Sequence, residues 1–155
     1  FYPHGELFLG TLAIIVFALS DLFDGAIARI SSTGPSTWGG FLDSTCDRLT
    51  DSAIVGSLIV FSLLDENGLE LVLVGALVAG SLVPYIRAKA ESYGIACTVG
   101  VAERTERLIL LLTAAGFHGL GVPYIFAVGV WLLLILSTIT AMQRIWVVRR
   151  GLKAL

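Results

Sequence analysis

Four long, mainly apolar stretches of the chain contain no Asp, Glu, Lys or Arg, and they limit its possible folds more than any other feature. They run over residues 7–20, 52–64, 71–86 and 108–143. Apolar helices of about 20 residues are the usual way for a chain to cross a bilayer. Only 14% of all residues are charged and 56% are hydrophobic, whereas soluble domains carry about a quarter charged residues. We therefore expect an all-α, polytopic transmembrane helix bundle, and we exclude a disordered chain, a coiled coil, a disulfide-stapled secreted module and a basic nucleic-acid binder.

The last stretch is too long for one crossing. Its middle contains Gly119, Gly121 and Pro123, which favour a turn, so we divide it into two helices near residues 117–123. This gives five membrane spans in a single domain over residues 1–155. The first three stretches are shorter than a span, so each of those helices carries charged residues at one membrane boundary.

The cations are sorted along the chain. The connections at residues 1–6, 65–70 and 117–123 contain no Lys or Arg, and all ten cations lie in the alternate connections or the C-terminal tail. By the positive-inside rule those segments face the cytoplasm. We expect a multi-pass protein of the cell membrane, with an additional N-terminal helix before residue 1 that would make six spans.

Four aspartates are concentrated around the first cytoplasmic connection. Asp21 and Asp24 are three residues apart, and Asp43 and Asp47 are four apart, so each pair lies on one helix face. Residues 31–40 are rich in Ser, Thr, Gly and Pro, and we predict a short turn that brings the two helices together antiparallel.

Four converging carboxylates would repel one another without cations. Carboxylate oxygens suit Mg²⁺, Mn²⁺ or Ca²⁺, and no His or Cys cluster offers a zinc site. A pair of divalent ions would relieve the repulsion, and such a pair typically serves phosphoryl chemistry. Intramembrane carboxylates also mark ion paths, so a divalent-cation transporter is an alternative; against it, the functional charges lie at one boundary only. A non-catalytic scaffold would not account for four aspartates in register.

The small residues and the arginine between these aspartates complete a longer pattern. The chain reads Asp-x-x-Asp-Gly-x-x-Ala-Arg, nine further residues, then Gly-x-x-x-Asp-x-x-x-Asp, from Asp21 to Asp47. Gly25 and Ala28 would let a phosphate approach the helix, and Arg29 could pair with it; alternatively, the small residues tighten helix packing and Arg29 snorkels. The whole pattern resembles the signature of the CDP-alcohol phosphotransferase family.

This resemblance implies a six-helix membrane enzyme that transfers a phosphatidyl group from a CDP-linked lipid, CDP-diacylglycerol, to an alcohol and releases CMP. It implies two Mg²⁺ ions, with Mn²⁺ possible, bridged by Asp21 and Asp43, with Asp24 completing one site and Asp47 the other. It also implies that Asp47 is the general base and that the protein is a homodimer. The residues implied in binding the CDP-lipid are Asp21, Gly25, Ala28, Arg29 and Ser36.

A second group of charged residues indicates which alcohol is used. Its members share the cytoplasmic face and are Arg87, Lys89, Arg104, Arg107 and Arg144. Five cations near a metal site favour an anionic acceptor, a phosphate monoester. The alternative explanation for these five cations is positive-inside topology, with local ion pairs between Arg87 and Glu91 and between Glu103 and Arg107.

The sequence around these cations also indicates the identity of the acceptor. VPYIRAKAESYG, VAERTERLILLLTAAG and MQRI are similar to the actinobacterial phosphatidylinositol phosphate synthase branch of the family, which implies inositol phosphate as the acceptor. Glycerol 3-phosphate is anionic too, so a phosphatidylglycerophosphate synthase is the nearest enzymatic alternative.

Overall fold

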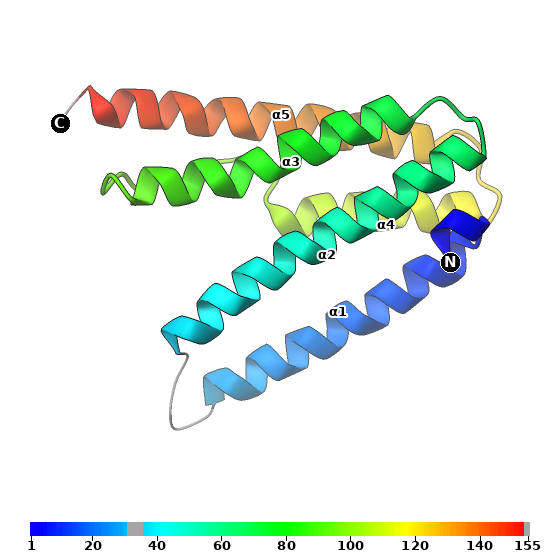
Figure 1. Cartoon of the computed structure of the whole chain (residues 1–155), viewed down its shortest axis with the longest axis horizontal. Coiled ribbons are helices and arrows are strands. Elements are labelled where there is room, and N and C mark those ends of the chain that lie inside the picture. The colour runs from blue at the N-terminus through cyan, green and yellow to red at the C-terminus, as the bar shows by residue number, and fades with distance from the viewer. Residues whose placement is uncertain (31–35, 154–155) are drawn as a thin grey trace.

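Helices make up nearly all of the chain (Figure 1). The computed structural model describes the backbone of residues 1–30 and 36–153 and the side chains of residues 1–18 and 36–153. No strand occurs within these ranges, which confirms the predicted all-α class. The elements are a short 3-10 helix η1 (Tyr2–His4) and the helices α1 (Leu7–Ile30), α2 (Thr37–Leu64), α3 (Glu70–Glu91), α4 (Arg104–Gly119) and α5 (Ile125–Leu152).

Two predicted turns are tested directly. The break in the longest charge-free stretch is confirmed, because α4 ends at Gly119 and α5 begins at Ile125. The predicted turn over residues 31–40 is wrong at its C-terminal end, where residues 37–40 belong to α2, while residues 31–35 lie outside the described residues. Ser36 is the cause: its hydroxyl accepts the backbone N–H of Gly39 at 2.9 Å, and such an N-cap lets a helix begin directly after the serine in spite of the following glycines.

The helices form one bundle in which α5 packs along both α3 and α4, α1 packs against α4, and α2 packs against α3 and η1. Figure 1 shows the α2–α3 and α4–α5 connections at the same end of the bundle as the N-terminus. At that end Tyr2 is buried and shares a hydrogen bond of 2.8 Å with the hydroxyl of Thr11. Burial raises the pKa of the Tyr2 hydroxyl above its usual value. The described Lys and Arg side chains lie away from that end, in the N-terminal halves of α2 and α4, in the C-terminal halves of α3 and α5, and just after α5.

Two of the described helices, α3 and α5, are long and apolar enough to cross a membrane by length and composition, with mean hydropathies of 1.8 and 2.3. Much of their apolar surface is exposed, including Leu71 at 78% and Met142 at 63%. A monomeric soluble protein rarely exposes such large apolar patches. The remaining predicted spans, including the shorter apolar part of α1 at Leu7–Ala18, stay predictions.

A glycine sets the distance between α4 and α5. A Cβ atom built at Gly129 would overlap the Cβ of Ala114, so the two helices approach as closely as their backbones permit. Small residues of this kind are the usual contacts between membrane helices, where dispersion forces replace the hydrophobic effect.

We expect Gly129→Ala to destabilise the bundle by about 1–3 kcal/mol, because overpacking forces the two helices apart. The matched control is Gly56→Ala, where an added Cβ meets nothing within 4 Å and the loss of glycine freedom in a helix favours folding. The measurement is the thermal unfolding midpoint of the detergent-solubilised full-length protein. Equal midpoints for the two variants would contradict the close approach.

Candidate functional site

One face of α2 carries three aspartates at successive turns. Asp43 is exposed, whereas Asp47 and Asp51 are half-buried. A carboxylate every four residues produces a continuous acidic stripe on a helix. The sequence signature includes the first two of these residues but not Asp51.

The other half of the signature lies in α1. The backbone of α1 runs through residue 30, so Asp21 and Asp24 are on one helical face. The side chains of Asp21, Asp24, Gly25, Ala28 and Arg29 fall outside the described residues, and their predicted roles stay predictions.

The described residues supply part of a possible site for a hard divalent cation. Asp43 and Asp47 are one turn apart, and carboxylates so spaced can share metal ions of the Mg²⁺ or Mn²⁺ kind. No group of three or more His, Cys, Asp or Glu side chains suited to a metal occurs within the described ranges. A complete site would therefore need further carboxylates, and the signature offers those of α1.

Arg104, the first residue of α4, links two of the α2 aspartates. Its Nη1 lies 2.9 Å from Oδ1 of Asp47, and its Nε lies 3.1 Å and 3.3 Å from the two carboxylate oxygens of Asp51. Arg48 is a more distant neighbour of the same carboxylates, at 3.9 Å from Asp47 and 3.7 Å from Asp51. The arrangement joins the acidic stripe of α2 to the cationic beginning of α4.

Beside this link is a polar cavity of about 380 Å³ at the cation-rich end of the bundle. Its charged lining residues come from four helices and the segment before α4: Asp47, Arg48, Arg87, Glu91, Glu103, Arg104, Arg107 and Arg144. Five arginines against three carboxylates leave an excess of positive charge. A cavity of this size and charge suits a small anionic ligand, because guanidinium groups match phosphate oxygens.

The predicted acceptor residues are only partly brought together. Arg87, Arg104, Arg107 and Arg144 line the cavity, whereas Lys89 does not. The ammonium of Lys89 lies over the ring of Tyr93, 5.0 Å from its centre. Arg87 also binds Glu91 at 2.9 Å, which is the local pair that the sequence offered as an alternative.

Arg107 and Arg144 are the two most buried cations of the described chain, at 8% and 3% exposure. Arg107 donates from Nη1 to the carbonyl of Ala102 at 3.1 Å. The predicted pair between Arg107 and Glu103 is not among the ion pairs of the described side chains; the Glu103 carboxylate instead lies 3.9 Å from Nη2 of Arg144. Ser36, predicted to contact a lipid nucleotide, is engaged as the α2 cap described above.

The segment between α3 and α4 is fastened to α5, and this fixes where α4 begins. Arg144 donates to the carbonyls of Val99 at 2.8 Å and Val83 at 2.9 Å. Thr140 accepts the N–H of Ala102 at 3.1 Å. Buried polar groups need such partners, so these contacts hold residues 99–102 against α5 and thereby place Arg104 beside α2.

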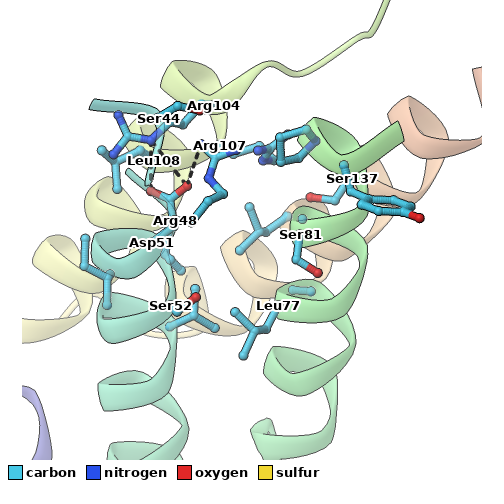
Figure 2. Close-up of a pocket in the computed structure, with 18 of the residues that line it drawn as sticks. Ser44, Arg48, Asp51, Ser52, Leu77, Ser81, Arg104, Arg107, Leu108 and Ser137 are labelled. Carbon is cyan, nitrogen blue, oxygen red and sulfur yellow. Dashed lines mark hydrogen bonds and ion pairs between the residues drawn. The ribbon is translucent and has the colours of Figure 1, made fainter. Parts of the chain in front are cut away.

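A second, mostly apolar cavity of about 400 Å³ lies next to the polar one, between α2, α3, α4 and α5. Figure 2 shows its lining, with Asp51, Arg48 and Arg104 at one end and Leu77 further along. Arg48, Arg104 and Arg107 line both cavities, whereas Asp47 lines only the polar one and Asp51 only the apolar one. The ion pairs of Arg104 therefore lie on the boundary between the two spaces.

Comparison with known sequences accounts for this arrangement. The profile of the CDP-alcohol phosphatidyltransferases matches residues 1–148. The chain belongs to this family. It is 42% identical to the phosphatidylinositol phosphate synthase of Streptomyces avermitilis, over 97% of this chain and 65% of that protein. It is 36% identical to the synthase of the same name from Mycolicibacterium smegmatis, over 96% of this chain and 68% of that protein. The chain thus spans about two thirds of the length of these relatives.

Solved structures of related proteins support the same family. The fold matches the crystal structure of Mycobacterium tuberculosis phosphatidylinositol phosphate synthase in complex with manganese and citrate, with a TM-score of 0.89 and 37% identity over 96% of this chain and 73% of that one. It also matches the structure of the same enzyme with CDP-DAG bound, with a TM-score of 0.87 and 37% identity over 95% of this chain and 76% of that one. The predicted family and its actinobacterial branch are confirmed, and the family together with the apolar helices indicates a membrane protein.

Proposed function

We propose that this chain carries the catalytic site of a phosphatidylinositol phosphate synthase, which transfers the phosphatidyl group of CDP-diacylglycerol to inositol phosphate and releases CMP. The names of its relatives and the CDP-DAG complex of a structural neighbour support the reaction. The single observation that carries the proposal is the polar cavity, where Asp47 lies 2.9 Å from Arg104 among further arginines. This arrangement would put a general base next to a surface that binds an anion.

The arginines would bind the phosphate of the acceptor. Arg87, Arg104 and Arg107 come from two helices that converge on the cavity, and a planar guanidinium binds phosphate oxygens in pairs. Holding the phosphate beside these arginines would turn the inositol ring toward α2. Such orientation increases the reaction rate, because the entropy cost of reaching the reactive geometry is met when the acceptor binds and not in the transition state.

Asp47 would take the proton of the attacking hydroxyl. A hydroxyl is a weak nucleophile, and a carboxylate within hydrogen-bond reach assists it by accepting that proton as the bond to phosphorus forms. The oxygen that bridges the phosphatidyl phosphorus to CMP then departs with the bonding electron pair. Divalent cations held by Asp43, Asp47 and the α1 aspartates would offset the charge on the pyrophosphate and on departing CMP.

The same proposal covers the setting of the enzyme. The cation-rich end would face the cytoplasm by the positive-inside rule, so that CMP and inositol phosphate exchange with the cytosol while the lipid chains stay in the bilayer. The five helices would all cross the cell membrane, Mg²⁺ would be the usual cation with two ions per site, and the enzyme would be a homodimer.

The acceptor is tested with the full-length protein in liposomes that contain CDP-diacylglycerol and Mg²⁺. Inositol phosphate, inositol and glycerol 3-phosphate are offered in parallel, and CMP release is measured. We expect turnover with inositol phosphate and about 100-fold less with inositol, because inositol lacks the phosphate that the arginines would bind and hydrogen bonds to a charged group are worth about 1.5–3 kcal/mol. CMP release with glycerol 3-phosphate alone would replace the proposed acceptor by that of a phosphatidylglycerophosphate synthase, and no CMP release with any acceptor would contradict the enzyme itself.

A further inference from the structure

Arg104 is held on two edges of its guanidinium by two different carboxylates. Asp51 faces the Nε edge, with both oxygens within 3.3 Å, and Asp47 faces Nη1 at 2.9 Å. Dashed lines in Figure 2 mark the contacts at the Asp51 carboxylate. A guanidinium is planar and rigid. A carboxylate that accepts a hydrogen bond from Nε therefore also fixes the direction of the other N–H groups.

The two carboxylates are reached from different sides. Asp47 lines the polar cavity and Asp51 lines the apolar one, while Arg104 lines both. Asp51 therefore lies behind Arg104 as seen from the polar cavity. From that position it can orient the guanidinium without touching a ligand bound in front of it.

Arg104 is the principal partner of Asp51. The contact with Arg104 has two short distances, whereas the contact of Asp51 with Arg48 is a single one of 3.7 Å. The start of α4 is already fixed through the bond between Ala102 and Thr140. The long side chain of Arg104 could still rotate, and the contacts with Asp51 at Nε and with Asp47 at Nη1 restrict that rotation before any ligand arrives.

We propose that Asp51 is a positioning residue for the acceptor: it presets the Arg104 guanidinium so that its free N–H groups face the phosphate monoester beside Asp47. This inference rests on the proposed function, since it concerns the acceptor of that reaction. Asp51 lies outside the aspartate signature, one turn deeper in α2 than the proposed base.

The expected consequence is a change in acceptor binding alone. Asp51→Asn should raise the KM for inositol phosphate about two- to tenfold, because ordering a long side chain on binding costs about 0.5–1.5 kcal/mol. The KM for CDP-diacylglycerol should stay the same, because Asp51 lies behind Arg104 on the acceptor side. A carboxylate that merely stabilised the fold would change both constants or neither.

The experiment measures CMP release by the full-length enzyme in liposomes, with each substrate varied in turn. The variants are Asp51→Asn, Asp51→Glu, Arg104→Gln and the double variant, with Asp65→Asn at the opposite end of α2 as the matched control. Asp51→Glu keeps the charge and should recover part of the loss. The double variant should match Arg104→Gln, because an effect transmitted through Arg104 disappears with it.

Several results would overturn the inference. An unchanged acceptor KM in Asp51→Asn would do so, and so would additive effects in the double variant. A lower acceptor KM would show that Asp51 acts as a competing anion and not as a positioning group. Each series is run with inositol phosphate and with glycerol 3-phosphate. If the wild-type enzyme used only glycerol 3-phosphate, the proposed acceptor would be refuted. The KM values of the variants for glycerol 3-phosphate would then still decide the role of Asp51.

Discussion

Asp47→Asn is expected to reduce the turnover of the full-length enzyme by about 100- to 10,000-fold, the range that a positioned general base contributes. The amide keeps the shape of the side chain but cannot accept the proton of the acceptor hydroxyl. It is also a poorer ligand for a hard divalent cation than a carboxylate. The measurement is CMP release at saturating CDP-diacylglycerol and inositol phosphate.

The fold should survive this change. Arg104 keeps its two-pronged contact with Asp51 when the Asp47 charge is removed, and Asp47 itself is only half-buried. The thermal unfolding midpoint should therefore stay within about 4 °C of the parent, as expected for a partly exposed ion pair worth about 1 kcal/mol or less. Asp65→Asn, the same substitution in an exposed turn, should leave turnover unchanged. Turnover of Asp47→Asn close to that of the parent would remove Asp47 from the role of base.

The helices and one of the breaks between them were predicted well from the sequence, because both depend on the local composition of the chain. Charge-free stretches predicted the helices, and the Gly119 to Pro123 region predicted the break between α4 and α5. The limit of this reasoning is visible at Ser36, whose hydroxyl caps α2 and makes part of a turn-like composition helical. Composition describes an average preference, whereas a single cap decides where a helix begins.

The contacts of the site were harder to predict because they join distant parts of the chain. Arg48 and Asp51 are three residues apart on one helix, so their spacing alone favours a pair, yet Arg104 lies closer to Asp51 than Arg48 does. That contact depends on where α4 begins, which is set by tertiary bonds to α5. Lys89 was grouped with the acceptor residues by its position in the chain, but it is directed onto Tyr93.

Arg144 illustrates how one cation can belong to both the architecture and the site. It lines the polar cavity, yet its Nε and Nη1 donate to two backbone carbonyls that no side-chain pattern in the sequence could indicate. These bonds hold the segment that sets the position of Arg104. The position of Arg104 in the proposed acceptor site therefore depends on Arg144, whether or not the remaining N–H groups of Arg144 reach the ligand.

Arg144→Met is accordingly expected to destabilise the protein by about 1–3 kcal/mol, because two hydrogen bonds from a charged donor are lost, a part-buried one to the Val99 carbonyl and a buried one to the Val83 carbonyl. The methionine fills much of the volume but supplies no hydrogen bond. The unfolding midpoint of the detergent-solubilised protein should fall by several degrees, and any remaining folded enzyme should show a raised KM for inositol phosphate because α4 is less firmly placed. Arg149→Met, an exposed position on the same helix, is the matched control and should unfold like the parent. A normal midpoint together with a raised acceptor KM would instead show that Arg144 serves only as a ligand of the acceptor, and that the segment over residues 99–102 holds its place without it.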